Sequence, residues 1–213
     1  MAARKPSAPV PFVLDFLAAA YPAASVLLDF RNPFELLVAT VLAAQCTDER
    51  VNQVTPALFR KYPDPRALAA ALPEAVEETV RPTGFFRNKA KAILGLSAAI
   101  AERHGGKVPA TMEALTALPG VGRKTASILL GACFGASALP VDTHVGRVSF
   151  RLGLTASKDP ARAEKDLAAV VPEAKRWEFA TRLGWHGRQV CLARKPRCPA
   201  CGLFPLCPRN GVK

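Results

Sequence analysis

The sequence has no long hydrophobic run and no sign of a targeting segment. No apolar stretch approaches the ~20 residues that a membrane span needs. The most apolar N-terminal stretch, 12–30, is interrupted by Asp15 and Asp29 and lacks the layout of a signal peptide. Half of the 213 residues are hydrophobic and 22% are charged, which excludes intrinsic disorder for the chain as a whole. We therefore expect a soluble cytoplasmic protein with no membrane partner.

Acidic residues are also scarce, with 17 Asp and Glu against 29 Lys and Arg, so that the formal net charge is +12. Such an excess indicates a polyanionic partner, of which nucleic acid is the commonest. The excess is concentrated in residues 174–213, which contain nine Lys or Arg and one Glu. A basic tail that only aids solubility is the alternative, but the same segment holds four of the six cysteines. A plain tail would not need them.

Strand-like alternation is nearly absent, whereas helix start signals recur. Asn32-Pro33-Phe34-Glu35 supplies an N-cap, a proline at the first position and a capping-box glutamate ahead of the apolar run 36–44. Asp64-Pro65 and Pro73-Glu74 open short helices in the same way. The patterns predict further helices at 88–103, 112–117, 124–134, 142–152, 160–170 and 176–186. Short helices with short links, and no internal repeat, indicate an all-α pair of domains.

The four C-terminal cysteines have the spacing of a metal centre. Cys191, Cys198, Cys201 and Cys207 follow C-x6-C-x2-C-x5-C. Disulfides are disfavoured in an intracellular protein. Four thiolates suit zinc, although zinc ribbons usually present two C-x-x-C knuckles and only one is present here. They equally suit a [4Fe–4S] cluster, so the spacing alone leaves both open. The other two, Cys46 and Cys133, lie in apolar helical contexts and are expected to be buried thiols.

Three cations lie between the first two of these cysteines: Arg194, Lys195 and Arg197. If a metal bound by the cysteines fixes this loop, the three cations would be held in a constant arrangement that can bind phosphate groups. Compensation of the metal centre's negative charge is the other interpretation, and the two are compatible.

A second motif joins two predicted helices at 118–126. Its residues are Leu118, Pro119, Gly120, Val121, Gly122, Arg123, Lys124, Thr125 and Ala126. Two glycines one residue apart allow a tight turn that brings bare N–H groups against a phosphate. The next helix adds its positive end, and a buried Val121 would anchor the turn. An ordinary αα turn explains one glycine, but the whole string is typical of a helix-hairpin-helix, which grips the DNA backbone without reading sequence.

Lys124 and Asp142 are the candidate catalytic residues. A neutral lysine beside DNA can attack a sugar C1′ and form a Schiff base. Asp142 begins Val141-Asp142-Thr143-His144, where an acid could stabilise an oxocarbenium charge or take a proton from the amine. A solvated phosphate-binding lysine and a helix N-cap aspartate are the plainer interpretations.

Together these residues resemble the endonuclease III family of DNA glycosylases with AP-lyase activity. The motifs run in order along almost the full chain: 33–37, Ala44-Gln45 with Thr47-Asp48, 84–90, the hairpin with Lys124, 141–144, and His186-Gly187-Arg188 leading into the cysteines. The cysteine spacing is the one that this family uses for a [4Fe–4S] cluster. The resemblance therefore favours iron–sulfur over zinc.

The resemblance implies two helical domains with a DNA-binding groove between them. A six-helix barrel with the hairpin would cover 26–136, and an iron–sulfur cluster domain would cover 1–25 and 137–213. The expected partner is damaged double-stranded DNA, bound by a monomer that associates with the bacterial nucleoid. Lys124 matches the family's nucleophile and Asp142 its catalytic carboxylate. The implied reaction is base excision of oxidised pyrimidines followed by β-elimination.

Gln45 and Phe85 match positions where the family fills the gap left by a flipped nucleotide. Phe85 is aromatic where an aliphatic wedge is common, and Phe86 stands where tyrosine is frequent. Without the family, Phe85 and Phe86 would be assigned to the core. Three alternatives remain: an adenine-mismatch glycosylase of the same superfamily, a non-catalytic DNA clamp and a redox protein. The presence of Lys124, and of only six residues after Cys207, disfavours the adenine-mismatch glycosylase. The pairing of Lys124 with Asp142 disfavours the non-catalytic clamp. The hairpin disfavours the redox protein, which would leave it unexplained.

Overall fold

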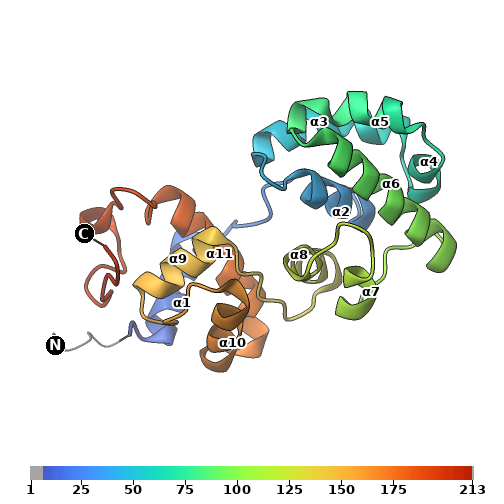
Figure 1. Ribbon diagram of the computed structural model, residues 1–213. Coiled ribbons are helices and arrows are strands. Elements are labelled where there is room, and N and C mark those ends of the chain that lie inside the picture. The colour runs from blue at the N-terminus through green and yellow to red at the C-terminus, as the bar shows by residue number, and fades with distance from the viewer. Residues whose placement is uncertain (1–6, 213) are drawn as a thin grey trace. The chain divides into compact units, whose positions relative to one another are not determined.

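The computed structural model describes residues 7–212, and this part of the chain contains helices and no strands (Figure 1). It divides into two compact units, 26–135 and 1–25 with 136–213. The boundaries expected from the sequence differ from these by one residue. Residues 1–6 and 213, which the expected second domain includes, lie outside the described part.

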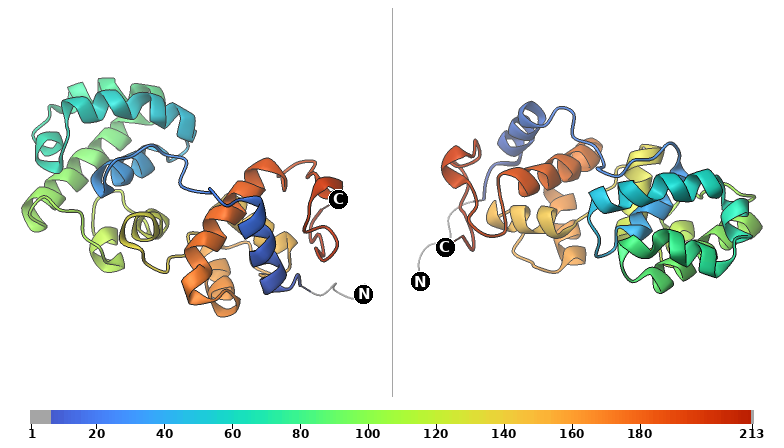
Figure 2. Two further views of the ribbon diagram at one scale, coloured as in Figure 1. Left: turned by 180° about the vertical axis from the view of Figure 1, so that it is seen from behind. Right: turned by 90° about the horizontal axis from the view of Figure 1, so that it is seen from above.

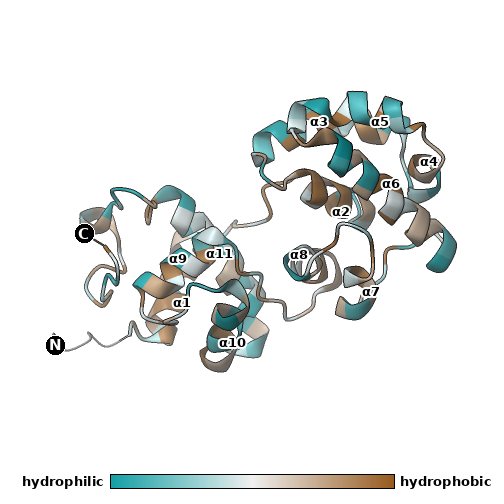
Figure 3. Ribbon diagram, viewed as in Figure 1, coloured by the Kyte–Doolittle hydropathy of each residue, from teal (hydrophilic) through white to brown (hydrophobic). Residues whose placement is uncertain are grey.

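The unit 26–135 is formed by a continuous series of helices. These are α2 (Pro33–Leu42), α3 (Asp48–Lys61), α4 (Pro65–Ala69), α5 (Pro73–Val80), the 3-10 turn η1 (Arg81–Thr83), α6 (Phe86–Arg103), α7 (Met112–Thr116) and α8 (Arg123–Phe134). Helix α2 is buried over almost its whole length. Figure 3 shows that its residues are largely apolar. It packs against α3, α6 and α8, so it forms the centre of this unit.

Local capping explains where α2 begins. The Asn32 side chain accepts a hydrogen bond from the Glu35 backbone N–H at 3.0 Å, and Pro33 occupies the first helical position. Buried Glu35 is paired with Arg31, whose Nε lies 2.9 Å from Oε1. The Asn32 half of the capping box read from the sequence is therefore present, whereas the Glu35 carboxylate accepts from the backbone N–H of Arg31 at 2.8 Å and not from that of Asn32.

The second unit packs the N-terminal helix against C-terminal helices. Its elements are α1 (Val10–Ala20), α9 (Thr143–Arg151), α10 (Pro160–Val170), the turn η2 (Glu173–Lys175), α11 (Arg176–Gln189) and the turn η3 (Cys198–Ala200). Helices α1 and α11 lie side by side, as both views of Figure 2 show. The core formed by α1, α9, α10 and α11 extends to Leu203 in the cysteine segment. The cysteine segment is thus packed against the helices of its own unit.

The predicted helices are all present, with ends that differ by up to three residues, but the sequence patterns missed α1 and α3. In α3 the reason is a proline. Pro56 lies inside this helix, and an interior proline removes a backbone hydrogen bond and normally argues against a helix. The signal that could have found it is Thr47, whose hydroxyl accepts from the Arg50 N–H at 3.3 Å. Within 7–212, no helix is long and apolar enough to cross a membrane.

Candidate functional site

The hairpin between α7 and α8 is a tight turn fixed by two buried residues. Leu118 is 4% and Val121 6% exposed, and the Val121 N–H donates to the Leu118 carbonyl at 3.1 Å. Gly120 adopts φ +74°, and a Cβ placed there would lie 2.8 Å from the Ala92 Cβ on α6. Only glycine therefore fits at this position. The backbone of the turn remains exposed at Gly120 and Gly122.

Helix α8 begins directly after this turn. Gly122 is its N-cap and has no side chain to bond the first N–H groups of the helix. Arg123 and Lys124 occupy the first two helical positions, and both are exposed. Exposed N–H groups, a helix dipole and two cations thus coincide, which is a favourable arrangement for a phosphate. Lys124 itself belongs to the first turn of this helix.

Asp142 caps α9 with one carboxylate oxygen and faces an arginine with the other. Its Oδ1 accepts from the backbone N–H groups of His144 at 2.8 Å and Val145 at 2.7 Å. Its Oδ2 lies 3.6 Å from Nη2 of Arg188 on α11. The side chain of Asp142 is 17% exposed, so water and a ligand can still reach it. The capping and the catalytic interpretations therefore do not exclude each other.

His144 belongs to the same group of side chains. Burial and the positive charge of Arg188 lower its pKa, against an opposing effect of Asp142. Its Nδ1 lies 3.2 Å from Nη2 of Arg147, and that guanidinium also donates to the Gly187 carbonyl at 2.9 Å and to the Cys191 carbonyl. His144 is thus held within this unit by Arg147. Lys124 belongs to the other unit of the chain, 26–135.

Gln45 and Phe85 share an unusual backbone conformation. Their φ angles are +54° and +48°, in the left-handed region that residues other than glycine seldom adopt. Both side chains are exposed, and Phe85 shows 63% of its surface. Phe85 is therefore not a core aromatic, whereas Phe86 is partly covered and lies between the guanidinium groups of Arg81 and Arg87. Strain combined with exposure is common at ligand contacts.

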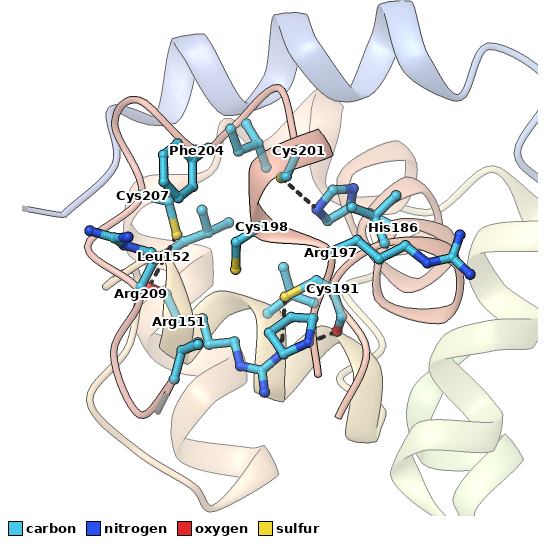
Figure 4. Close-up of a pocket in the computed structure, with 15 residues that line it drawn as sticks. Arg151, Leu152, His186, Cys191, Arg197, Cys198, Cys201, Phe204, Cys207 and Arg209 are labelled. Atoms are coloured by element: carbon cyan, nitrogen blue, oxygen red, sulfur yellow. Dashed lines mark hydrogen bonds between the residues drawn. The ribbon is translucent and has the colours of Figure 1, made fainter. Parts of the chain in front are cut away.

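The four C-terminal cysteines line one cavity, and Figure 4 shows their sulfur atoms around the same space. All four are half-buried and reduced, as are Cys46 and Cys133, which the sequence had placed in the core. Burial, with the nearby cysteine charges, raises the pKa of Cys201 and of Cys207. Within 7–212, no three His, Cys, Asp or Glu side chains are grouped closely enough to hold a metal ion. The thiols thus surround a space rather than converging on one point.

Arginine and histidine complete the wall of this cavity. Arg151 is 7% exposed, and its Nη1 donates to the Cys191 sulfur at 3.2 Å and to the Leu192 carbonyl at 2.6 Å. His186 lies with Nε2 3.5 Å from the Cys201 sulfur, and its Nδ1 is 2.9 Å from the Tyr21 hydroxyl. Burial lowers the pKa of His186 to about 4. In the described chain, Arg151 bonds carbonyls and a thiol but no carboxylate, so an anionic group bound by the four sulfurs would fit its charge.

The three cations of the cysteine segment lie between the first and second cysteines. Arg194, Lys195 and Arg197 are all exposed, and Lys195 has a φ of +49°. The Arg197 backbone N–H donates to the Val190 carbonyl at 3.0 Å. Since Arg151 also donates to the Ala193 carbonyl at 2.9 Å, the base of this loop is held to α9 and α11. The cations are therefore presented from a fixed loop.

Sequence reasoning missed the arginines that organise this unit. Arg147 and Arg151 lie one turn apart on α9 and reach the backbone of the first cysteine. Arg188 was recognised only as part of a motif, and its pairing with Asp142 was not foreseen. The available signal was the i,i+4 spacing of two arginines on a helix with an apolar face.

Comparisons with known proteins agree on one family. A model of the HhH-GPD superfamily base excision DNA repair proteins matches residues 38–173. The chain is 52% identical to the endonuclease III of Synechocystis over 197 residues, 92% of this chain and 90% of the relative. It is 45% identical to that of Bacillus subtilis, over 96% and 93%. A structure of a non-covalent endonuclease III–DNA complex superimposes with a TM-score of 0.88 at 43% identity, covering 93% of both chains.

Proposed function

The chain belongs to the endonuclease III family of HhH-GPD base excision DNA repair proteins, and from that we propose that it excises oxidised pyrimidines from duplex DNA with Lys124 as its nucleophile. It is a base excision repair DNA glycosylase, and AP-lyase activity is typical of its family. The similarity to a structure of endonuclease III bound to DNA supports DNA as the partner. We further propose that it acts as a monomer on damaged double-stranded DNA in a bacterial cytoplasm.

In the proposed reaction, the damaged nucleotide leaves the base stack to reach the protein. The neutral amine of Lys124 attacks C1′ and forms a C–N bond while the bond to the base breaks, and the base leaves with its electron pair and a proton. The sugar ring then opens: the C1′–O4′ bond breaks, O4′ takes a proton, and the nitrogen becomes an imine that acidifies the 2′ hydrogen. Loss of that proton expels the 3′ phosphate, which cuts the strand, and water then releases the lysine.

Asp142 is proposed to act on the charge that develops at the sugar. Its Oδ2 is not used in capping, and a negative oxygen near C1′ would stabilise the oxocarbenium character of the transition state or accept a proton from the amine. The proposal requires Lys124 and Asp142 to reach the same nucleotide from two units of the chain.

We assign DNA binding to groups in both units of the chain. The hairpin from Leu118 to Arg123 would hold a backbone phosphate through its N–H groups, with Gly120, Val121 and Gly122 forming the turn. Arg194, Lys195 and Arg197 would hold a second stretch of backbone. Gln45 and Phe85 would fill the space that the flipped nucleotide leaves.

The family suggests an iron–sulfur cluster, and we propose a [4Fe–4S] cluster held by Cys191, Cys198, Cys201 and Cys207. The four thiols around one cavity and the buried Arg151 beside them suit a bound group of negative charge. Such a cluster would cross-link the C-terminal segment and fix the cationic loop. It takes no part in the proposed chemistry.

Borohydride trapping tests the role of Lys124. Reduction of the imine should leave the wild-type protein covalently attached to a thymine-glycol duplex, and Lys124→Ala should abolish this product. Lys91→Ala removes another exposed lysine and should trap as the wild type does. Because Lys124 is exposed, its variant should also melt at the wild-type temperature. Duplex binding without trapping on any oxidised pyrimidine would instead support a non-catalytic clamp.

A further inference from the structure

Lys89 is a buried lysine on α6 that the proposed reaction does not use. Only 5% of it is exposed, whereas Lys91, two residues along the same helix, is exposed. In the part of the chain that the structure describes, no carboxylate pairs with the Lys89 ammonium. Its Nζ donates to the Thr83 carbonyl at 2.7 Å. Burying an ammonium group costs free energy, so this contact calls for an explanation beyond packing.

The contact holds the turn that carries Phe85. Thr83 is buried and ends the turn η1, and its hydroxyl donates to the Val80 carbonyl at 2.8 Å. The backbone N–H of Lys89 donates to the Phe85 carbonyl at 3.1 Å. One residue therefore holds the carbonyls on both sides of Gly84, through its side chain and its backbone. Between these two contacts the chain passes through φ +70° at Gly84 and +48° at Phe85.

The same ammonium also lies near the loop that carries Gln45. Cys46 follows Gln45, and its negative charge would raise the pKa of Lys89, against the larger lowering effect of burial. The Cys46 backbone N–H donates to the Ala43 carbonyl at 3.1 Å, which closes the turn after α2. Both loops belong to the unit 26–135. Lys89 thus holds the turn before Phe85, and its ammonium feels the charge of the residue after Gln45; Phe85 and Gln45 are the left-handed residues other than glycine in this unit.

We propose that Lys89 is a positioning residue that holds Phe85 in its strained, outward conformation before DNA binds, so that the ring enters the duplex without a prior rearrangement. The reason is energetic. A left-handed phenylalanine backbone costs free energy and persists only where its surroundings fix it. A charged donor on the Thr83 carbonyl, two residues before Phe85, supplies that constraint, and a side chain ordered in advance lowers the cost of binding. This inference rests on the proposed function, in which Phe85 fills the gap in the duplex.

Lys89→Met tests the inference, because methionine has a similar length and no donor. The duplex would carry 2-aminopurine opposite an abasic-site analogue, where entry of a wedge unstacks the reporter and raises its fluorescence. We expect the unstacking rate to fall about tenfold or more with the loss of a charged hydrogen bond. Lys91→Met, on the same helix, should match the wild type. Lys89→Arg, which keeps the positive donor, should recover much of the rate.

A double-mutant cycle with Phe85→Ala separates positioning from general stability. If Lys89 acts through Phe85, Lys89→Met should change the unstacking rate less than about twofold in the Phe85→Ala background. Equal effects in both backgrounds would show that Lys89 only stabilises the fold and would overturn the inference. Should Lys89→Met fail to fold, Lys89→Gln, judged folded by its thermal melt, takes its place in the cycle.

The two proposals fail in different ways. A wild-type protein that neither unstacks the reporter nor traps with borohydride would overturn the proposed function and this inference with it. A wild-type protein that does both, with an unaffected Lys89→Met variant, would overturn the inference alone. Loss of unstacking in Lys89→Met, together with a wild-type thermal midpoint and non-additivity with Phe85→Ala, would support it.

Discussion

At the scale of single residues, Asp142 shows how one side chain can serve both stability and chemistry. Its Oδ1 bonds two backbone N–H groups at the start of α9, and its Oδ2 faces Arg188. Capping uses one oxygen and fixes the orientation of the other. A residue that looks like an ordinary N-cap in the sequence is therefore also a carboxylate held in a defined direction.

Two substitutions at Asp142 should separate these roles. Asp142→Asn keeps a good N-cap and removes the charge, so we expect a fall in single-turnover base excision of at least about 100-fold. Asp142→Ala removes both, and should in addition lower the free energy of unfolding by about 1 kcal/mol. Urea denaturation and single-turnover kinetics measure the two effects. Near wild-type excision by Asp142→Asn would mean that the residue is a cap alone.

At the scale of elements, the hairpin depends on backbone conformation more than on side chains. Leu118 and Val121 anchor it to the core, and Gly120 turns the chain where a Cβ would meet Ala92. Gly122 is different, because its φ is −89° and a Cβ there would meet nothing within 4 Å. The two glycines of the motif thus have separate reasons to be present.

This difference predicts opposite results for two alanine substitutions. Gly120→Ala combines a clash with an unfavourable φ and should lower the free energy of unfolding by about 1–3 kcal/mol. Gly122→Ala should change the free energy of unfolding by no more than about 0.5 kcal/mol. This variant should nevertheless weaken DNA binding, because the new methyl group lies on the exposed face of the turn. Thermal melts and fluorescence anisotropy measure these effects. Equal stability of both variants would contradict the assignment.

At the scale of the whole molecule, the structure shows which of the basic residues behind the net charge of +12 are buried and which are exposed. Arg151 is buried at the cavity wall and Arg188 lies beside Asp142, so neither is a simple surface charge. Arg194, Lys195 and Arg197 are exposed on a loop whose base is tied to α9 and α11. The basic segment therefore contributes both to the internal structure of its unit and to the surface available for phosphate.

The salt dependence of DNA binding should report the surface part of this charge. Changing Arg194, Lys195 and Arg197 together to Ala should reduce the slope of log K against log salt by roughly 0.9 for each phosphate that the variant no longer neutralises. Lys158→Ala with Lys165→Ala removes two exposed charges from α10 and the turn before it, and should leave the slope nearly unchanged. An unaltered slope in the triple variant would mean that these cations serve only the cavity.

The proposed cluster is testable by its composition. The purified protein should be brown, absorb broadly toward the blue end of the visible range, and contain four iron and four sulfide per chain, as [4Fe–4S] requires. Cys198→Ser should lose the colour and the order of the loop, while Cys133→Ser, outside the cavity, should keep both. Iron analysis and hydrogen exchange of residues 190–212 measure these effects. A colourless protein with stoichiometric zinc would contradict the assignment.

The sequence by itself determined the helical class, most helix positions and the family. Proline at first helical positions, capping side chains and the glycine pair act over a few residues, so they can be recognised without the fold. The family motifs also identified the candidate nucleophile, the carboxylate and the cysteines, although their roles stay predictions. Helix α3 escaped because the local rule about proline was outweighed by packing against α2 and α5.

Only the tertiary structure decided which residues support these motifs. Arg188 meets Asp142 across two helices, Arg151 meets Cys191 across 40 positions, and Lys89 reaches Thr83 through a bend in the chain. The left-handed backbone of Phe85 was equally hidden, and without the family motif its exposure would have been too, because a phenylalanine beside another is ordinarily a core residue. Such pairings depend on burial and on contacts between distant segments. No local pattern of residues encodes them, because the free energy that fixes them comes from the packed fold.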